Sequence, residues 1–130
     1  MRLQTVSIFV DDQQRALDFY TGPLGFRVAA DVPLGEHRWI TLVSPEQPGG
    51  TQLSLEPKDH PAVRPFTDAI AGDGIPFLVL GVEDVRAEYE RLSAAGVVFP
   101  QPPTVMGPVT VAVLDDTCGN LLQLAQPTHG

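Results

Sequence analysis

The chain is poor in basic residues. Eight Lys and Arg residues stand against sixteen Asp and Glu residues, which gives a formal net charge of -8 at pH 7. The basic residues are scattered along the chain and form no stripe that could follow a phosphate backbone. We therefore expect no nucleic acid partner.

The chain also has a single cysteine, Cys118, which excludes a disulfide within the chain. Its neighbours are acidic and would not activate a thiolate, so we interpret Cys118 as a small turn residue rather than a nucleophile. No apolar run approaches the length of a membrane span, and no basic and apolar leader precedes the first apolar segment. These features predict a cytoplasmic protein without membrane contact.

What the chain does contain is one pattern that occurs twice. Asp12 and Asp84, 72 residues apart, each begin a helical stretch, and Gly25 and Gly96, 71 residues apart, each follow the end of one. A repeat of this length predicts two similar modules that bury their apolar faces together. The 130 residues, of which 43% are hydrophobic, are enough for one domain with a real core.

Each module is predicted to be a strand, a helix and three further strands. In the first strand, residues 3–10, the side chains alternate between an apolar face for the helix and a mixed face. The predicted elements of module 1 (residues 1–56) are strands 3–10, 26–32, 37–43 and 51–56, with a helix after Asp12. Those of module 2 (residues 75–126) are strands 75–82, 97–100, 108–114 and 120–125, with helix 85–95. Residues 57–74 are interpreted as a linker with a short helix over 63–71.

A βαβββ module cannot cover its own sheet. Two such modules side by side therefore predict an α+β fold with one curved, eight-stranded mixed sheet, helices outside and a concave inner face. Residues 1–130 would form a single domain.

These features together resemble the vicinal oxygen chelate superfamily, which includes glyoxalase I, extradiol dioxygenases, fosfomycin-resistance enzymes and bleomycin-resistance proteins. The resemblance covers nearly the whole chain. It rests on the Val10-x-Asp12 opening, Phe19-Tyr20, Leu24-Gly25-Phe26, the second opening at Val82, and the closing Asp115-Asp116-x-x-Gly119-Asn120. It implies the glyoxalase/bleomycin resistance fold and a homodimer.

Members of this superfamily that perform metal chemistry hold a divalent cation with histidines and glutamates from the first and last strands of each module. The matching positions here are Thr5 and Phe77 on the opening strands, and Ser54 and Gln123 on the closing strands. None of the four is a strong metal ligand, and the Phe77 ring would occupy the space of the ion. The resemblance therefore predicts no metal and no cofactor.

A shift in register does not restore such a site. A two-residue shift brings Ser7 and Glu56 to the inner face, which supplies one carboxylate and no histidine. A one-residue shift would turn the polar side chains toward the helix-packed side, which is energetically excluded.

The segment Glu36-His37-Arg38-Trp39 is polar and aromatic within an otherwise apolar strand. In one interpretation this strand has a solvated face and Trp39 belongs to the core. In the other, His37 and Trp39 line a cavity together with Thr41, with the indole for stacking and the imidazole for hydrogen bonding or proton transfer. His60 in the linker and His129 near the end are interpreted as surface residues.

Without a metal, a concave and partly aromatic pocket would remain, as in the bleomycin-resistance branch that the chain resembles. We expect a metal-independent protein that binds a small, partly aromatic or cationic molecule for resistance or sequestration. No catalytic residue is assigned. The candidate ligand-binding residues are Thr5, Ser7, Phe9, His37, Trp39, Gln52, Ser54, Glu56, Phe77 and Gln123.

Two alternatives stay open. One is a glyoxalase-like lyase, isomerase or dioxygenase that uses His37 and Glu56 as ligands of a divalent metal or as a metal-free acid–base pair. The other is a structural partner protein with a filled interior.

Overall fold

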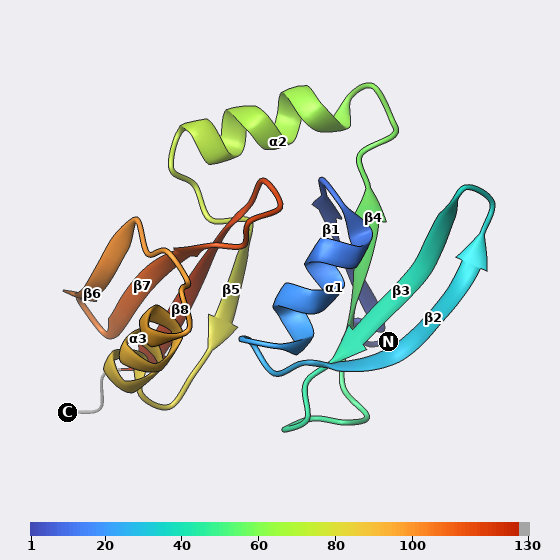
Figure 1. The fold of residues 1–130 in the computed structure, drawn as a ribbon. Helices are drawn as coiled ribbons and strands as arrows, with labels where there is room; N and C mark the ends of the chain where they lie inside the picture. The colour runs from blue at the N-terminus through green and yellow to red at the C-terminus, as the bar shows by residue number, and fades with distance from the viewer. Residues whose placement is uncertain (128–130) are drawn as a thin grey trace. The chain divides into compact units, whose positions relative to one another are not determined.

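The computed structural model describes residues 1–127, so His129 lies outside the described residues. The chain divides into two compact units that meet in sequence between Thr67 and Asp68. Each unit is built on a four-stranded sheet with a helix between its first two strands (Figure 1). A further helix, α2 (Val63–Gly72), spans the boundary between the units in sequence.

Unit 1 has the strand order β1-β4-β3-β2, in which β1 and β4 are parallel and the other pairs antiparallel. Its elements are β1 (Thr5–Val10), α1 (Gln13–Thr21), β2 (Arg27–Leu34), β3 (His37–Val43) and β4 (Gln52–Pro57). Unit 2 has the matching order β5-β8-β7-β6. Its elements are β5 (Leu78–Gly81), α3 (Val85–Ala94), β6 (Gln101–Met106), β7 (Val109–Asp115) and β8 (Leu121–Pro127).

The matching orders confirm the α+β class and the two βαβββ modules. In their hydrogen bonding the eight strands form two four-stranded mixed sheets, one in each unit, rather than one continuous ladder.

The repeated aspartates and glycines have the same structural roles in both units. The carboxylates of Asp12 and Asp84 cap α1 and α3 by accepting from the backbone N–H groups three residues later, at 2.9 and 3.0 Å. Gly25 and Gly96 follow the two helices with φ of 77° and 93°, a region that disfavours residues with a Cβ. Local backbone chemistry therefore accounts for this part of the sequence repeat.

Two predicted strand boundaries in module 2 are wrong. Residues 97–100 form no strand, because the Val97 N–H donates to the Leu92 carbonyl and so belongs to the end of α3. The actual strand is β6, whose Pro102 and Pro103 resemble a loop in sequence but are tolerated at a sheet edge. The strand predicted from residue 75 begins only at Leu78, because the Ile75 N–H donates to Ile70 at the end of α2.

The core of unit 1 lies between α1 and one face of its sheet. The helix contributes Ala16, Phe19 and Tyr20, and the sheet contributes Ile8, Val10, Ile40, Leu42, Leu53 and Leu55, all of them buried. Removing side chains of this size from water is worth about 1.5–3 kcal/mol each, so this packing fixes which face of the sheet remains available.

The turn between β7 and β8 is organised by the buried carboxylate of Asp116. Its Oδ1 accepts from the N–H groups of Cys118 and Asn120 at 2.7 and 3.0 Å, and its Oδ2 accepts from Asn120 Nδ2 at 3.0 Å. Cys118 is fully buried in this turn, which agrees with its interpretation as a turn residue. Within the described part of the chain, no helix has the length and apolar character needed to cross a membrane.

Candidate functional site

The face of the unit 1 sheet opposite α1, here called the inner face, carries the candidate residues of the first module. The register pairs Ser7 with Ser54 and Ser54 with Thr41, so these three side chains lie side by side. The same alternation places eight candidates on this face: Thr5, Ser7, Phe9, His37, Trp39, Gln52, Ser54 and Glu56.

Phe77 and Gln123 belong to unit 2. The Phe77 N–H donates to the Leu121 carbonyl at 2.7 Å just before β5, and Val79 pairs with Gln123. Phe77 and Gln123 therefore lie on one face of the unit 2 sheet, together with Val111 and Val113. That face is far more apolar than the inner face of unit 1. The expected convergence of Phe77 and Gln123 with Thr5 and Ser54 stays a prediction.

A small polar cluster lies at the middle of the inner face of unit 1. Ser54 Oγ donates to Glu56 Oε1 at 2.6 Å. Thr41 and Ser54 are both 1% exposed, and the Thr41 hydroxyl has no hydrogen-bond partner among the described residues. A buried hydroxyl normally has a hydrogen-bond partner, so the Thr41 hydroxyl is the exceptional polar group of this cluster.

Aromatic and apolar side chains flank this cluster. Trp39 is 38% exposed and is not part of the buried core, so the interpretation of Trp39 as a core residue is wrong. In the β2–β3 pair, Trp39 lies opposite Val32 and His37 lies opposite Leu34; the side chains of Val32 and Leu34 are exposed. The inner face therefore has a buried polar centre beside an exposed apolar flank.

The strands β3 and β4 diverge from this cluster toward the His37 end of unit 1 (Figure 1). They pair at Thr41–Ser54 and Leu42–Leu53, whereas β7 and β8 pair from Val109–Pro127 to Asp115–Leu121.

The side chain of Gln13, at the start of α1, bridges the two separated strands. Its Nε2 donates to the carbonyls of Arg38 at 2.6 Å and Leu55 at 2.9 Å, and its Oε1 accepts from the Arg38 N–H at 3.0 Å. Gln13 was not among the predicted site residues. The one feature of the sequence that could have indicated it is its position directly after Asp12, at the start of the predicted helix.

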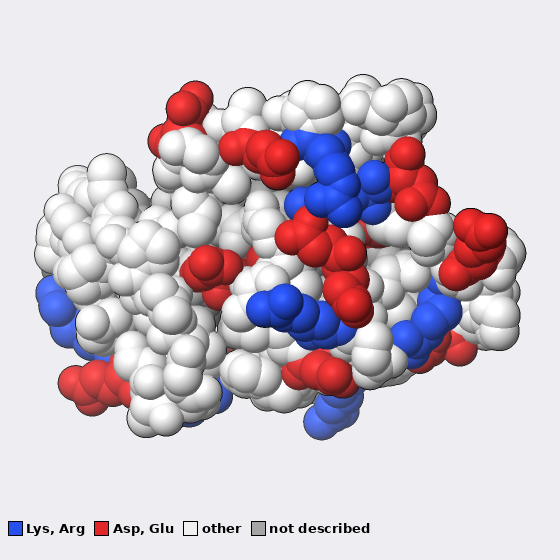
Figure 2. All heavy atoms as spheres, turned by 45° about the horizontal axis from the view of Figure 1, so that its top comes forward, with Lys and Arg blue, Asp and Glu red and all other residues white. Residues whose placement is uncertain are grey.

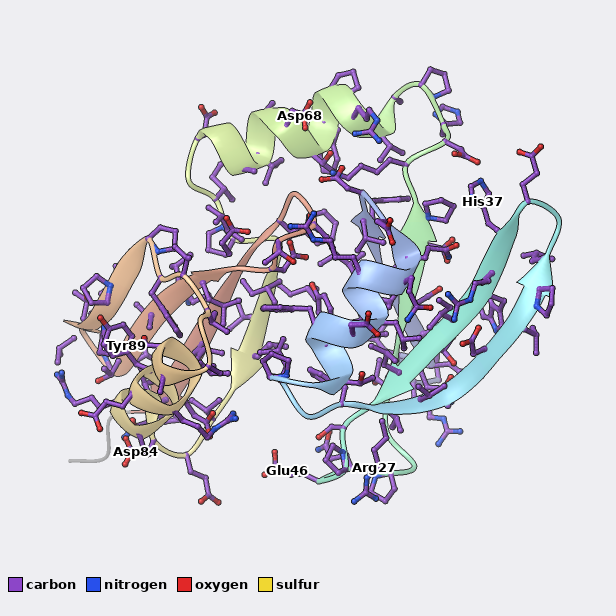
Figure 3. The ribbon with its side chains drawn as sticks, viewed as in Figure 1. Arg27, His37, Glu46, Asp68, Asp84 and Tyr89 are labelled. Atoms are coloured by element: carbon purple, nitrogen blue, oxygen red, sulfur yellow. The ribbon has the colours of Figure 1, made fainter. Side chains whose placement is uncertain are left out.

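His37 Nε2 is hydrogen-bonded to the carboxylate of Asp59, which lies beyond the end of β4. This contact connects the first residue of β3 to the segment that follows β4. Figure 3 shows His37 at one end of unit 1 and Arg27 and Glu46 at the opposite end. Asp59 was not among the predicted residues, because nothing in the linker sequence places it next to β3.

A charge cluster lies at the ends of β1 and β4. The Lys58 ammonium, whose side chain is 1% exposed, lies 2.9 Å from Asp11 Oδ1, and Arg64 Nη1 lies 3.1 Å from the same oxygen. The Lys58 contact is an ion pair without hydrogen-bond geometry. Burial alone would raise the pKa of Asp11, but Lys58 and Arg64 hold it below its ordinary value. On the face in Figure 2, blue side chains lie next to red ones rather than in one patch.

A separate hollow of about 470 Å³ opens near the other end of β1 and β4. One candidate residue, Gln52, contributes to it. The complete lining is Arg2, Leu3, Gln4, Pro48, Gly49, Gly50, Thr51 and Gln52.

The residues at the metal-ligand positions of the superfamily do not fit a divalent metal. Thr5, Ser54, Phe77 and Gln123 offer two hydroxyls, one amide and one phenyl ring, and the Ser54 hydroxyl already donates to Glu56. Among residues 1–127, no group of three or more His, Cys, Asp or Glu side chains is placed to hold a metal ion. His37 and Glu56, considered as alternative ligands, bond instead to Asp59 and Ser54.

Comparison with known proteins gives the family. The uncharacterized protein YurT of Bacillus subtilis (strain 168) is 52% identical over 97% of this chain and 99% of its own length. The crystal structure of UcmS2 matches with a TM-score of 0.83 at 40% identity, covering 96% of this chain and 97% of that one. TnmS3, an antibiotic binding protein from Streptomyces sp. CB03234, matches with a TM-score of 0.80 at 30% identity, covering 98% of this chain and 96% of that one.

A family model also matches the chain over residues 2–124. The chain therefore belongs to the Glyoxalase/Bleomycin resistance protein/Dioxygenase superfamily.

Proposed function

We propose that this protein binds a small, partly aromatic or cationic molecule on the inner face of unit 1, without a metal ion, in a resistance or sequestering role. One observation carries the proposal: the exposed indole of Trp39 lies on the same face as the Thr41–Ser54–Glu56 cluster, where the buried Thr41 hydroxyl has no partner within residues 1–127. An aromatic surface beside a few convergent polar groups is the usual composition of a small-molecule site. The likeness to TnmS3, described as an antibiotic binding protein, supports the same class of function.

Metal independence is proposed from the donor chemistry. Hydroxyl and amide groups bind zinc or iron weakly compared with imidazole and carboxylate, and a phenyl ring does not bind them at all. The remaining candidate residues, including Phe77 and Gln123 in unit 2, are proposed to contribute to binding within one functional domain.

We also propose a homodimer that acts in the cytoplasm. The exposed Val32, Leu34 and Trp39 on the inner face of unit 1 are the kind of apolar surface that a ligand or a second copy would cover. The single buried cysteine is compatible with a reducing compartment.

The experiment uses the fact that Trp39 is the single tryptophan of the chain. Its fluorescence therefore reports on the proposed site without a label. Metal-free bleomycin and daunorubicin are titrated into the protein in buffer containing EDTA, and calorimetry provides the stoichiometry. We expect saturable quenching by at least one of them, and weaker calorimetric binding to Trp39→Leu.

Two results would favour the alternatives instead. Binding or turnover that appears only after addition of Zn, Ni, Fe or Mn, and that is lost in Glu56→Ala, would support the enzyme. No fluorescence or melting-temperature change with any compound of a broader aromatic panel would support a structural partner protein.

A further inference from the structure

We propose that the separation between β3 and β4 is a recognition subsite for a positively charged, hydrogen-bond-donating group of the ligand, with Glu56 as its acceptor. The group would be an amine, amidine or guanidine attached to an aromatic ring. This inference rests on the proposed function and specifies which molecules the site accepts.

Pro57 prevents a regular ladder between β3 and β4 at one position of this stretch. Continuing the register of Thr41–Ser54 and Leu42–Leu53 places Arg38 opposite Pro57. The backbone N–H and C=O of Arg38 face β4, but proline has no N–H to donate to that carbonyl. The amide of Gln13 takes the place of the missing strand partner by bonding to both groups of Arg38.

Unit 2 provides the internal comparison. The residue 69 positions after Pro57 is Gln126, and it pairs with Thr110 in an intact β7–β8 ladder. The Gln126 side-chain Oε1 accepts from the Val85 N–H at the start of α3, at 2.9 Å. The strand separation is therefore a property of unit 1 and not of the repeated fold.

The separation is bounded at both ends by defined contacts. The ladder closes it at Thr41–Ser54, and the contact between His37 and Asp59 lies beyond it. Between these contacts, Trp39 of β3 and Glu56 of β4 both lie on the inner face, one on each side of the unpaired stretch. In a regular ladder these side chains would be cross-strand neighbours, and we propose that a ligand group lies between them here.

The chemistry of this position favours a cation that donates hydrogen bonds. Ser54 donates to one oxygen of Glu56 and leaves the other to accept. Among the described residues no Lys or Arg makes an ion pair with Glu56, because the nearest cation along β4, Lys58, is paired with Asp11. Glu56 therefore presents uncompensated negative charge, and the indole of Trp39 on the same face also attracts cations.

Three probes with the same three-ring framework test the charge preference. They are 9-aminoacridine as the cation, acridine at pH 8 as the neutral ring and 9-anthracenecarboxylate as the anion. Affinities are measured from Trp39 fluorescence and confirmed by calorimetry. The cation should bind about tenfold more tightly than the neutral ring, and the anion should bind most weakly.

The variant Glu56→Gln removes the charge but retains an acceptor for Ser54. It should weaken 9-aminoacridine binding by about 10-fold to 100-fold and leave acridine binding unchanged. Glu46→Gln, in the exposed β3–β4 loop at the opposite end of unit 1, changes the net charge equally and should affect neither probe. A melting curve for each variant shows that it is folded.

The outcomes separate the two proposals. Equal binding of the three probes, or equal effects of Glu56→Gln and Glu46→Gln on the cation, would overturn the charged subsite and leave the proposed function in place. Failure of all three rings, bleomycin and daunorubicin to bind the wild-type protein would overturn the proposed function, and the subsite with it.

Discussion

The side-chain amide of Gln13 bonds to both backbone polar groups of Arg38, donating to its carbonyl at 2.6 Å and accepting from its N–H at 3.0 Å. Gln13, at the start of α1, thereby provides hydrogen bonds to Arg38 of β3 that the neighbouring strand β4, with Pro57, does not provide. Through a further bond to the Leu55 carbonyl at 2.9 Å, the same amide connects β3 to β4 where the two strands are not paired with each other.

The variant Gln13→Leu should lower the free energy of unfolding by about 2–3 kcal/mol, because it leaves three part-buried backbone groups without their partner. Gln14→Leu is the matched control: it removes only exposed side-chain contacts, with Asp18 and with the Arg38 guanidinium, and should cost about 0.5 kcal/mol or less. Urea unfolding measures both. Equal losses in the two variants would show that Gln13 has no special role.

Removing the Thr41 hydroxyl should stabilise the unliganded protein. The variant Thr41→Val keeps the shape of the side chain and removes a buried hydroxyl without a partner, so we expect a gain of about 1 kcal/mol in urea unfolding. The same change should weaken binding of a ligand that bonds to this hydroxyl. Thr67→Val is the control, since the Thr67 hydroxyl donates to the Arg64 carbonyl. A loss of stability in Thr41→Val would mean that the hydroxyl is satisfied.

Asp11 should contribute to stability in a pH-dependent way. Its pKa in the folded protein lies below the ordinary value of 3.8, because Lys58 and Arg64 stabilise the carboxylate. A depressed pKa stabilises the fold at pH values above the ordinary one, and that contribution is lost as the pH falls through the folded value.

The variant Asp11→Asn should therefore be less stable than the wild type at pH 7, where it leaves the buried Lys58 ammonium without a carboxylate. The difference should shrink as the pH falls below 3.8. Asp68→Asn on the exposed side of α2 is the control and should stay close to the wild type at both pH values. A gap between Asp11→Asn and wild type that is constant with pH would contradict this account.

The Asp116–Asn120 pair allows a reciprocal test. Asp116→Asn places an amide donor against Asn120 Nδ2 and should cost about 2 kcal/mol in a buried turn. Adding Asn120→Asp restores a donor–acceptor pair with the roles exchanged, so the double variant should recover part of that loss. A double variant that is no more stable than the single one would show that the side-chain contact does not organise the turn.

The sequence predicted the parts of the fold that depend on local chemistry. The helix starts at Asp12 and Asp84, the alternation in β1 and the order of the elements all follow from neighbouring residues. The β6 boundaries were missed because prolines tolerated at a sheet edge also occur in loops.

The site was only partly predictable for a similar reason. Alternation along single strands predicted that the candidates of module 1, including Trp39 and Glu56, share one face; the strand pairing has them on one face, and their part in binding stays a prediction. The contacts of Gln13 with Arg38 and of His37 with Asp59 join residues more than twenty positions apart. No periodicity in the sequence indicates such pairs, and the effect of Pro57 becomes visible only once the register is known.

The most direct test of the account is the affinity of 9-aminoacridine for the wild-type protein, measured by calorimetry before and after exhaustive treatment with EDTA. Binding at one site per chain, with the same dissociation constant in both preparations and saturable quenching of Trp39, is the predicted result. Binding that disappears with EDTA and returns with a stoichiometric divalent metal would contradict metal-independent recognition on this face.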